Sequence, residues 1–261
     1  MDISIHTTYD RFESGQWKQI EAEAPVETDV ALTVNGEVWT TFMCTPILVE
    51  EMMVGFLFNE GIIQGMEDVA DVRICEHGDN VDVWTTRSVT QPTKWRRTSG
   101  CAGGVTAVEA DASITPLPSD GWRVSSAQIT RLVELLFESQ ELYRETGGIH
   151  TSALSDGDQV ILSAEDIGRH NTLDKIAGMW LAKMPELKRK ILITTGRISS
   201  EMLQKAARMG AGILISRTSP SSLAIRLAEQ YGITLIGYAR RHRFNLYAHP
   251  ERVLIETQEP S

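Results

Sequence analysis

The chain has 261 residues, of which 42% are hydrophobic and 23% charged, and its formal net charge is -10. This composition is typical of an ordinary globular protein with one large domain or two modest ones. The acidic charge argues against a general nucleic-acid binder, because such proteins need a basic surface. No apolar run approaches the roughly 18 residues of a membrane span, and the start does not resemble a secretory signal. We therefore expect a cytoplasmic protein with neither nucleic acid nor a membrane as its partner.

The first half of the chain reads as a small mixed α and β unit. Its first twenty-odd residues are polar, and we expect an edge segment or a tail there. Strand-like alternation over residues 31–43, with the turn pair Asn35-Gly36 inside it, predicts a β-hairpin. The other predicted elements are a helix that begins at Thr45-Pro46 and ends before Gly61, and strands around residues 70–74 and 81–84.

A linker with two prolines and a Ser-Asp-Gly turn follows at residues 113–123. It predicts a boundary between an N-terminal α+β domain, residues 1–118, and a C-terminal α/β domain, residues 119–261. Ser125 and Gln128 form a capping box for a long helix. Beyond it strands alternate with helices, which predicts β-α-β units on a mostly parallel sheet flanked by helices. The predicted strands are 160–163, 190–195, 212–216, 233–237 and 252–256, and the predicted helices are 171–181, 199–209 and 219–230.

The three cysteines differ in their surroundings, and their irregular spacing argues against a disulfide framework or a structural zinc site. Cys44 and Cys75 lie in apolar strand patterns and are expected to be packing residues. Cys101 lies among small residues, in the stretch TSGCAGG, just after the basic run at 94–97. Nearby cations favour the thiolate, which is the reactive form of cysteine. Two interpretations stay open here: a reactive or carrier thiol, and a plain loop cysteine.

Arginines recur in the turns that follow the predicted strands of the second half. These turns contain Arg169, Arg197, Arg217 and the run 238–245. In open α/β sheets ligands bind outside the carboxyl ends of the strands, where helix N-termini also offer free N–H groups. A single arginine there could simply form a surface ion pair. The repeated placement favours a site for a phosphate-bearing ligand such as a nucleotide, since arginine binds phosphate through two donors.

Other motifs are absent or ambiguous. The chain has no G-x-G-x-x-G and no Walker A lysine motif, so neither a dinucleotide fold nor a P-loop is supported. The histidines show no metal-ligand spacing, and we expect no metal site. Glu165-Asp166 could be an acid/base pair or a helix cap. Asp174 fits the N3 position of a helix that begins at Asn171.

Eight ordered blocks, spread over most of residues 27–252, carry a family resemblance. They are VNGE at 34–37, TP at 45–46, GFLFNEGII at 55–63, TGGIH at 146–150, EDIGRHN at 165–171, TGR at 195–197, SPSSLA at 219–224 and RFNLYAHP at 243–250. In these blocks the chain resembles the formate dehydrogenase accessory sulfurtransferases.

The resemblance implies a sulfurtransferase that takes persulfide sulfur from a cysteine desulfurase. The sulfur goes to the molybdopterin guanine dinucleotide form of the molybdenum or tungsten cofactor, bound as substrate and destined for apo-formate dehydrogenase. It also implies a homodimer and a C-terminal domain that resembles the cytidine deaminase fold without its zinc. The position that matches the persulfide-carrying cysteine is Cys101. The positions that match the guanine nucleotide site are Tyr238, Ala239, Arg240, Arg241, His242 and Arg243, with Arg197, Arg217 and Asn245.

One departure from the family pattern bears on the mechanism. The family loop commonly reads S-x-C-G-x-C-G, whereas Gly104 stands here at the second cysteine position. One thiolate can still accept and donate sulfur, because exchange uses one attacking sulfur at a time. Two functions stay open. Either Cys101 is the nucleophile of an enzyme, with Arg96 and Arg97 lowering its pKa, or the chain is a non-catalytic chaperone that delivers the cofactor to the dehydrogenase.

Overall fold

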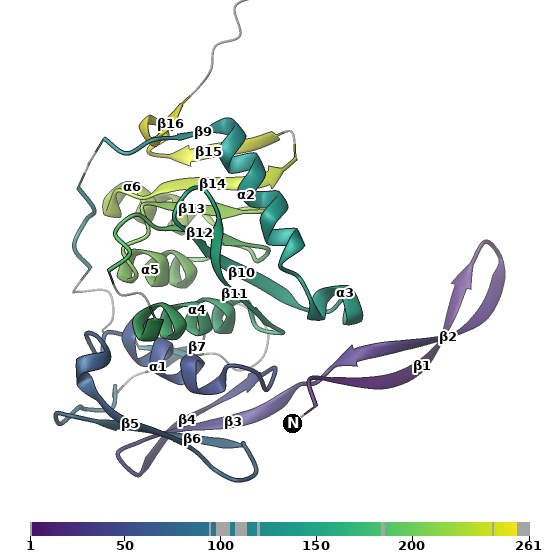
Figure 1. Ribbon diagram of the computed structural model, residues 1–261, viewed down its shortest axis with the longest axis horizontal. Helices are drawn as coiled ribbons and strands as arrows, with labels where there is room; N and C mark the ends of the chain where they lie inside the picture. The colour runs from purple at the N-terminus through teal and green to yellow at the C-terminus, as the bar shows by residue number, and fades with distance from the viewer. Residues whose placement is uncertain are drawn as a thin grey trace, which may run out of the picture.

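The computed structural model describes residues 2–93, 95–97, 105–107, 114–118, 121–183, 186–241 and 243–254 (Figure 1). The elements of the first half are β1 (Ser4–Glu13), β2 (Gln16–Pro25), β3 (Thr28–Val34), β4 (Glu37–Cys44), α1 (Val49–Asn59), the 3₁₀ turn η1 (Met66–Asp68), β5 (Val69–Ile74), β6 (Asn80–Thr85), β7 (Trp95–Arg97) and β8 (Val105–Ala107). Those of the second half are β9 (Val124–Ser125), α2 (Ser126–Glu138), α3 (Leu142–Thr146), β10 (His150–Ser155), β11 (Val160–Asp166), α4 (Arg169–Lys183), β12 (Ile191–Thr194), α5 (Ser200–Arg208), β13 (Ile213–Ser216), α6 (Ser222–Tyr231), β14 (Thr234–Arg240), β15 (Arg243–Ala248), the 3₁₀ turn η3 (Pro250–Arg252) and β16 (Val253–Leu254).

The first half contains a four-stranded sheet in the order β4-β3-β6-β5. The predicted hairpin is confirmed, because Asn35 and Gly36 connect β3 to β4 with φ of 52° and 83°, as a two-residue hairpin turn requires. Asn35 also fastens this turn to β6: its side-chain oxygen accepts the backbone N–H of Thr85 at 2.9 Å. The predicted strand pair is confirmed as β5 and β6.

The second half contains a six-stranded sheet in the order β11-β10-β12-β13-β14-β15. Only β12, β13 and β14 run parallel, and the other pairings are antiparallel. The prediction of a mostly parallel sheet is therefore wrong, because β10 and β15 were not recognised as strands. Both are joined to a neighbour by a short connection, and a short connection between paired strands forces an antiparallel hairpin.

Helices cover both faces of this sheet (Figure 1). On one face Ile191, Ile193 and Ile213 belong to a core that includes the apolar stripe of α2. On the other face the alternate residues Leu192 and Leu214 belong to the core of α4, α5 and α6. Because both sides are buried, the central strands are continuous apolar runs, and this explains why the sequence identified them readily. The predicted capping box of α2 is also present.

Helix α1 crosses α4 so closely that two glycines are required (Figure 1). A Cβ on Gly55 would collide with the backbone oxygen of Asp174, and a Cβ on Gly178 with the backbone oxygen of Glu51. The same hydrophobic core runs from β3 through α1 and α4 to α6. The two predicted domains thus share one core.

Two buried ion pairs lie beside this crossing. The ammonium of Lys175 is 2.6 Å from Asp166 and also donates to the carbonyl of Thr45. Lys205 is 2.6 Å from Asp174, whose carboxylate accepts a hydrogen bond from Asn59 at 2.8 Å. The prediction that Asp174 occupies the N3 position is wrong, because α4 begins two residues earlier than expected and turns this side chain into the core.

The first residues form a long β-ribbon rather than a tail. Strands β1 and β2 pair over their whole length through the turn Ser14-Gly15 and extend away from the body (Figure 1). The sequence prediction failed here because both faces of the ribbon are largely exposed. Exposed strands lack the clean alternation that marks a half-buried strand.

We predict that Gly178→Ala destabilises the protein by about 3 kcal/mol, because the added methyl group meets backbone that cannot move without separating α1 from α4. Urea unfolding should show a lower midpoint. Gly148→Ala is the matched control: a Cβ there would make only an ordinary contact, at 3.4 Å from Pro25. Equal midpoints for the two variants would contradict the tight crossing.

Candidate functional site

The carboxyl ends of the parallel strands define one edge of the six-stranded sheet. Thr194 at the end of β12 pairs with Ser216 at the end of β13, so the turns that follow them begin at the same level. The antiparallel strands contribute to this edge too, since His150 at the start of β10 pairs with Asp166 at the end of β11. The predicted arginine turns therefore do meet at one sheet edge, as expected for a ligand site in an α/β fold.

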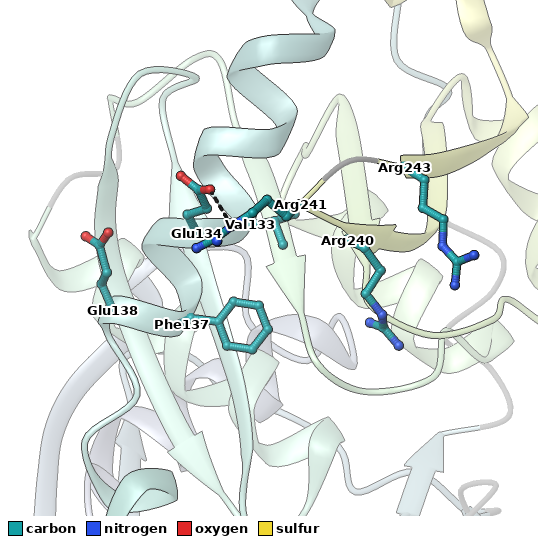
Figure 2. Close-up of a pocket in the computed structure, with 7 residues that line it drawn as sticks. All are labelled: Val133, Glu134, Phe137, Glu138, Arg240, Arg241 and Arg243. Carbon is teal, nitrogen blue, oxygen red and sulfur yellow. Dashed lines mark ion pairs between the residues drawn. The ribbon is translucent and has the colours of Figure 1, made fainter.

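A cavity of about 690 Å³ lies where this edge meets α2 (Figure 2). Arg240, Arg241 and Arg243 line it from β14, β15 and the turn between them. Arg241 forms an ion pair with Glu134 at 3.0 Å, whereas the guanidinium groups of Arg240 and Arg243 point in the same direction. Two cationic groups thus remain to meet an anion.

The wall on α2 was missed by the sequence analysis. Val133, Glu134, Phe137 and Glu138 line the cavity from this helix. A signal was present, because Val133 belongs to the predicted apolar stripe and Phe137 follows it by four residues, on the same side of the helix. The carboxylates of Glu134 and Glu138 reduce the net positive charge of the cavity, so its positive charge is concentrated on the arginine side.

Arg217 contacts two of the residues that line this cavity, Phe137 and Arg240. The guanidinium of Arg217 lies 4.0 Å from the centre of the Phe137 ring, and its carbonyl accepts a hydrogen bond from Arg240 at 2.8 Å. Burial and the charge of Arg240 lower the pKa of Arg217. Burial is the larger cause, and the smaller contribution of Arg240 shows that the two guanidinium groups are close enough to repel each other.

The remaining predicted nucleotide-site residues fall into different environments. Tyr238 is exposed, has a left-handed φ of 52°, and donates its N–H to the carbonyl of Thr218. Ala239 is fully buried, so only its backbone can take part in binding. Asn245 lies on β15, with its amide 3.4 Å from the hydroxyl of Tyr247. His242 lies outside the described residues.

Arg197 is separated from this group. Together with Arg169 it lines a second cavity of about 390 Å³, formed with serines at the starts of α5 and α6. The arginines that the sequence assigned to one edge are therefore divided between two cavities.

Glu165 is a helix cap, which was one of the two interpretations of the Glu165-Asp166 pair, the other being an acid/base pair. Its carboxylate accepts the backbone N–H groups of Glu141, Leu142 and Tyr143 at 2.7–3.0 Å and so fixes α3 to the sheet edge. Asp166 is committed to the buried pair with Lys175. Neither carboxylate is arranged for acid/base chemistry.

The described cysteines are poorly suited to attack a sulfur donor. Cys44 is fully buried, and burial with the charge of Asp166 raises the pKa of its thiol to about 12. The expectation that Cys75 packs in the core is wrong: it is half-buried, and its thiol donates to Asp79 at 2.9 Å. Cys101 lies outside the described residues.

The strands on either side of Cys101 are described. Arg97 at the end of β7 pairs with Val105 at the start of β8, which brings the two ends of the 98–104 segment together. Trp95 anchors β7 to the body, because its ring stacks on Phe56 of α1 at 5.9 Å.

Within the described residues, no group of three or more His, Cys, Asp or Glu side chains could hold a metal ion. None of the helices in that part of the chain is long and apolar enough to cross a membrane.

Solved structures place this mixed α/β fold in a class of accessory proteins. The chain superposes with a TM-score of 0.80 and 29% identity on a protein from Desulfotalea psychrophila described as a formate dehydrogenase accessory protein, covering 97% of this chain and 100% of that one. The model of the FdhD/NarQ family matches residues 25–254. The chain belongs to this family.

Curated relatives match over nearly their whole length. A sulfur carrier protein FdhD from Listeria monocytogenes serotype 4b is 36% identical over 260 residues, which is 97% of this chain and 100% of the relative. The protein of the same name from Staphylococcus haemolyticus is 36% identical over 248 residues, 93% of this chain and 94% of the relative.

We predict that the free energy of unfolding falls as the pH drops below about 6.5, because the sheet edge holds histidines in the neutral form. Burial and the charge of Arg169 lower the pKa of His170 well below 6.5 and also lower that of His150. As the pH falls, these histidines are protonated in the unfolded chain before they are protonated in the folded one. Each of them therefore lowers the free energy of unfolding by up to about 1.4 kcal/mol per pH unit. Urea unfolding at a series of pH values should show a shallower decline for His170→Gln. Equal slopes in the parent and the variant would contradict the lowered pKa.

Proposed function

We propose that this chain is a sulfur carrier in the maturation of formate dehydrogenase and that it works as a homodimer in the cytoplasm. Sulfur comes from a cysteine desulfurase, is held as a persulfide on Cys101, and passes to the molybdopterin guanine dinucleotide form of the molybdenum or tungsten cofactor. The names of the curated relatives and of the solved structure support the accessory role. The cytidine deaminase resemblance of the second half belongs to the same proposal.

The observation that carries the proposal is the arginine-lined cavity at the end of β14. Its volume of about 690 Å³ is in the range of small-molecule sites, and Arg240 and Arg243 offer donors that suit a diphosphate. The ring of Phe137 provides an apolar wall in the same cavity. A ligand with a ring system and a diphosphate, such as a guanine dinucleotide, satisfies both parts of this lining.

The sulfur step needs one nucleophilic thiol. The thiolate of Cys101 attacks the outer sulfur of the desulfurase persulfide, the sulfur–sulfur bond of the donor breaks, and the donor cysteine leaves as a thiolate. Of the other two cysteines, Cys44 is buried with a raised pKa and Cys75 is hydrogen-bonded to Asp79. Cys101 is therefore the thiol to which we assign the transfer.

The second candidate is a chaperone that binds the cofactor and delivers it without handling sulfur. Gly104, in place of the second cysteine of the family loop, favours this candidate. The arginine-lined cavity serves either function, so the test must follow the sulfur atom itself.

After incubation with a cysteine desulfurase and free cysteine, we predict that the Cys101 peptide gains the mass of one sulfur atom, because its thiolate accepts the persulfide sulfur. Cys101→Ser should gain none, while Cys75→Ser, a matched removal of a partly exposed thiol, should load like the parent. Peptide mass spectrometry measures the sulfur gained in the parent and in each variant. If Cys101 of the parent gains no sulfur but can still be alkylated, the sulfur-carrier function is wrong and the chaperone function is favoured.

For the cavity, we predict that Arg240→Ala combined with Arg243→Ala weakens the binding of guanosine diphosphate at least tenfold, because charge-assisted hydrogen bonds to phosphate are lost. Isothermal titration calorimetry measures the affinity. Arg226→Ala, which removes an exposed arginine of α6, is the control and should bind like the parent. Equal affinities for all three proteins would show that the nucleotide binds elsewhere.

A further inference from the structure

The acidic side of the arginine-lined cavity has no part in binding a diphosphate. Glu134 and Glu138 lie one turn apart on α2, and both line the cavity beside the apolar pair Val133 and Phe137. A carboxylate repels a phosphate, so these side chains weaken a site that binds phosphate alone. An ionised carboxylate can only accept hydrogen bonds. This side of the cavity is therefore suited to a group that donates them.

The lining changes its chemistry from one side of the cavity to the other. Figure 2 shows the two carboxylates on one side of the Phe137 ring and the guanidinium groups of Arg240 and Arg243 on the other. The order across the cavity is thus carboxylate, aromatic ring, arginine. A purine nucleotide has the matching order: the hydrogen-bonding edge of the base, the flat ring and, beyond the ribose, the diphosphate.

The two carboxylates differ in what they already bind. Glu134 is held on both sides, since one oxygen is 3.0 Å from Nε of Arg241 and the other is 3.6 Å from Nη1 of Arg131. In Glu138 only Oε1 accepts a hydrogen bond from a side chain of the described residues, at 3.1 Å from Arg131. The Glu138 side chain is 60% exposed, so a ligand can reach its second oxygen.

We propose that Glu138 is the specificity-determining residue of this cavity and that its carboxylate reads the Watson–Crick edge of a guanine base. The inference deepens the proposed function and rests on it, because it takes the cavity to be the guanine nucleotide site. Phe137, the residue before Glu138 on the same helix, provides the ring on which the base stacks.

Guanine and adenine differ at the edge that meets the carboxylate. Guanine presents two neighbouring donors, N1–H and the 2-amino group, and the two oxygens of a carboxylate accept both. Adenine presents one donor, the 6-amino group, beside an acceptor, N1. The lone pair of that N1 faces a carboxylate oxygen, so a hydrogen bond is replaced by a repulsion. A two-point contact of this kind discriminates between bases by roughly tenfold or more.

Arg131 prepares Glu138 for this contact. Its hydrogen bond uses one of the roughly four acceptor sites of the carboxylate and restricts the rotation of the side chain. The positive charge of Arg131 also keeps Glu138 ionised, and only the ionised form accepts from both guanine donors. Glu134 instead neutralises Arg241, which leaves Arg240 and Arg243 to the phosphates.

The test compares guanosine diphosphate with adenosine diphosphate by isothermal titration calorimetry on the full chain. The parent should bind the guanine nucleotide at least tenfold more tightly. Glu138→Gln should abolish this preference, because the glutamine amide pairs one acceptor and one donor with adenine and turns a donor toward a guanine donor. Glu134→Gln should shift both affinities in the same direction, since it changes only the charge beside the arginines. Glu145→Gln, at an exposed position of α3, should bind like the parent.

A pterin carries the same pair of donors as guanine, so 6-hydroxymethylpterin diphosphate is titrated beside the nucleotides. Weaker binding of the pterin than of guanosine diphosphate supports the assignment to guanine. Tighter binding would assign Glu138 to the pterin end of a cofactor and overturn the proposal.

Two further results would overturn the proposal: equal affinities of the parent for the two nucleotides, or an unchanged preference in Glu138→Gln. If both nucleotides bind equally but weaken in the double variant of Arg240 and Arg243, the nucleotide site stands and only the reading of guanine fails. If the parent binds no guanosine diphosphate, the nucleotide site of the proposed function fails as well. Sulfur loading of Cys101 is measured without a nucleotide and is a separate result.

Discussion

The close crossing of α1 and α4 is the contact on which the rest of the structure depends. Gly55 and Gly178 allow the two helix backbones to touch, and the hydrophobic core then runs from one sheet to the other. Asp174, beside this contact, pairs with Lys205 in the same buried region. The end of α1 completes this pair, because Asn59 donates to Asp174 at 2.8 Å and Glu60 is 3.7 Å from Lys205. If the helices separated, these buried charges would lose partners, and an uncompensated charge in a protein interior costs several kcal/mol. The N-terminal sheet is therefore held to the C-terminal sheet by shape and by charge together.

This attachment determines what surrounds the sheet edge. Because α4 is pressed against α1, its first turn holds Arg169 and His170 beside the ends of β12 and β13, on the side away from α2. The turn from β14 to β15 lies instead beside α2 and forms the larger cavity with it. One sheet edge therefore carries two cationic cavities. Arg217, at the end of the strand between them, contacts the larger one through Phe137.

The sequence predicted those parts of the fold whose signal is local. The turn at Asn35-Gly36, the capping box at Ser125 and the apolar runs of β12 to β14 were all found, since each depends on neighbouring residues. The ribbon was not found because both of its faces are largely exposed. Strands β10 and β15 were not found because each has only six residues, in which polar and apolar residues are mixed. The division of the arginines was equally hidden. Which side of a sheet a turn faces depends on the helix packed there, and the spacing of Arg197 and Arg240 carries no information about that.

The packing also limits which thiol can take part in chemistry. Cys44 is fully buried and close to Asp166, so forming its thiolate would take a charge out of water and place it beside a buried carboxylate, and the pKa of the thiol is raised. Cys75 follows the edge strand of the N-terminal sheet, and its thiol donates a hydrogen bond to Asp79. The two cysteines are therefore occupied in different ways, Cys44 by burial in the core and Cys75 by a hydrogen bond at the surface. The thiol to which we assign the transfer in the proposed function, Cys101, instead follows Arg96 and Arg97 in the sequence, and cations near a cysteine favour the thiolate that sulfur transfer requires.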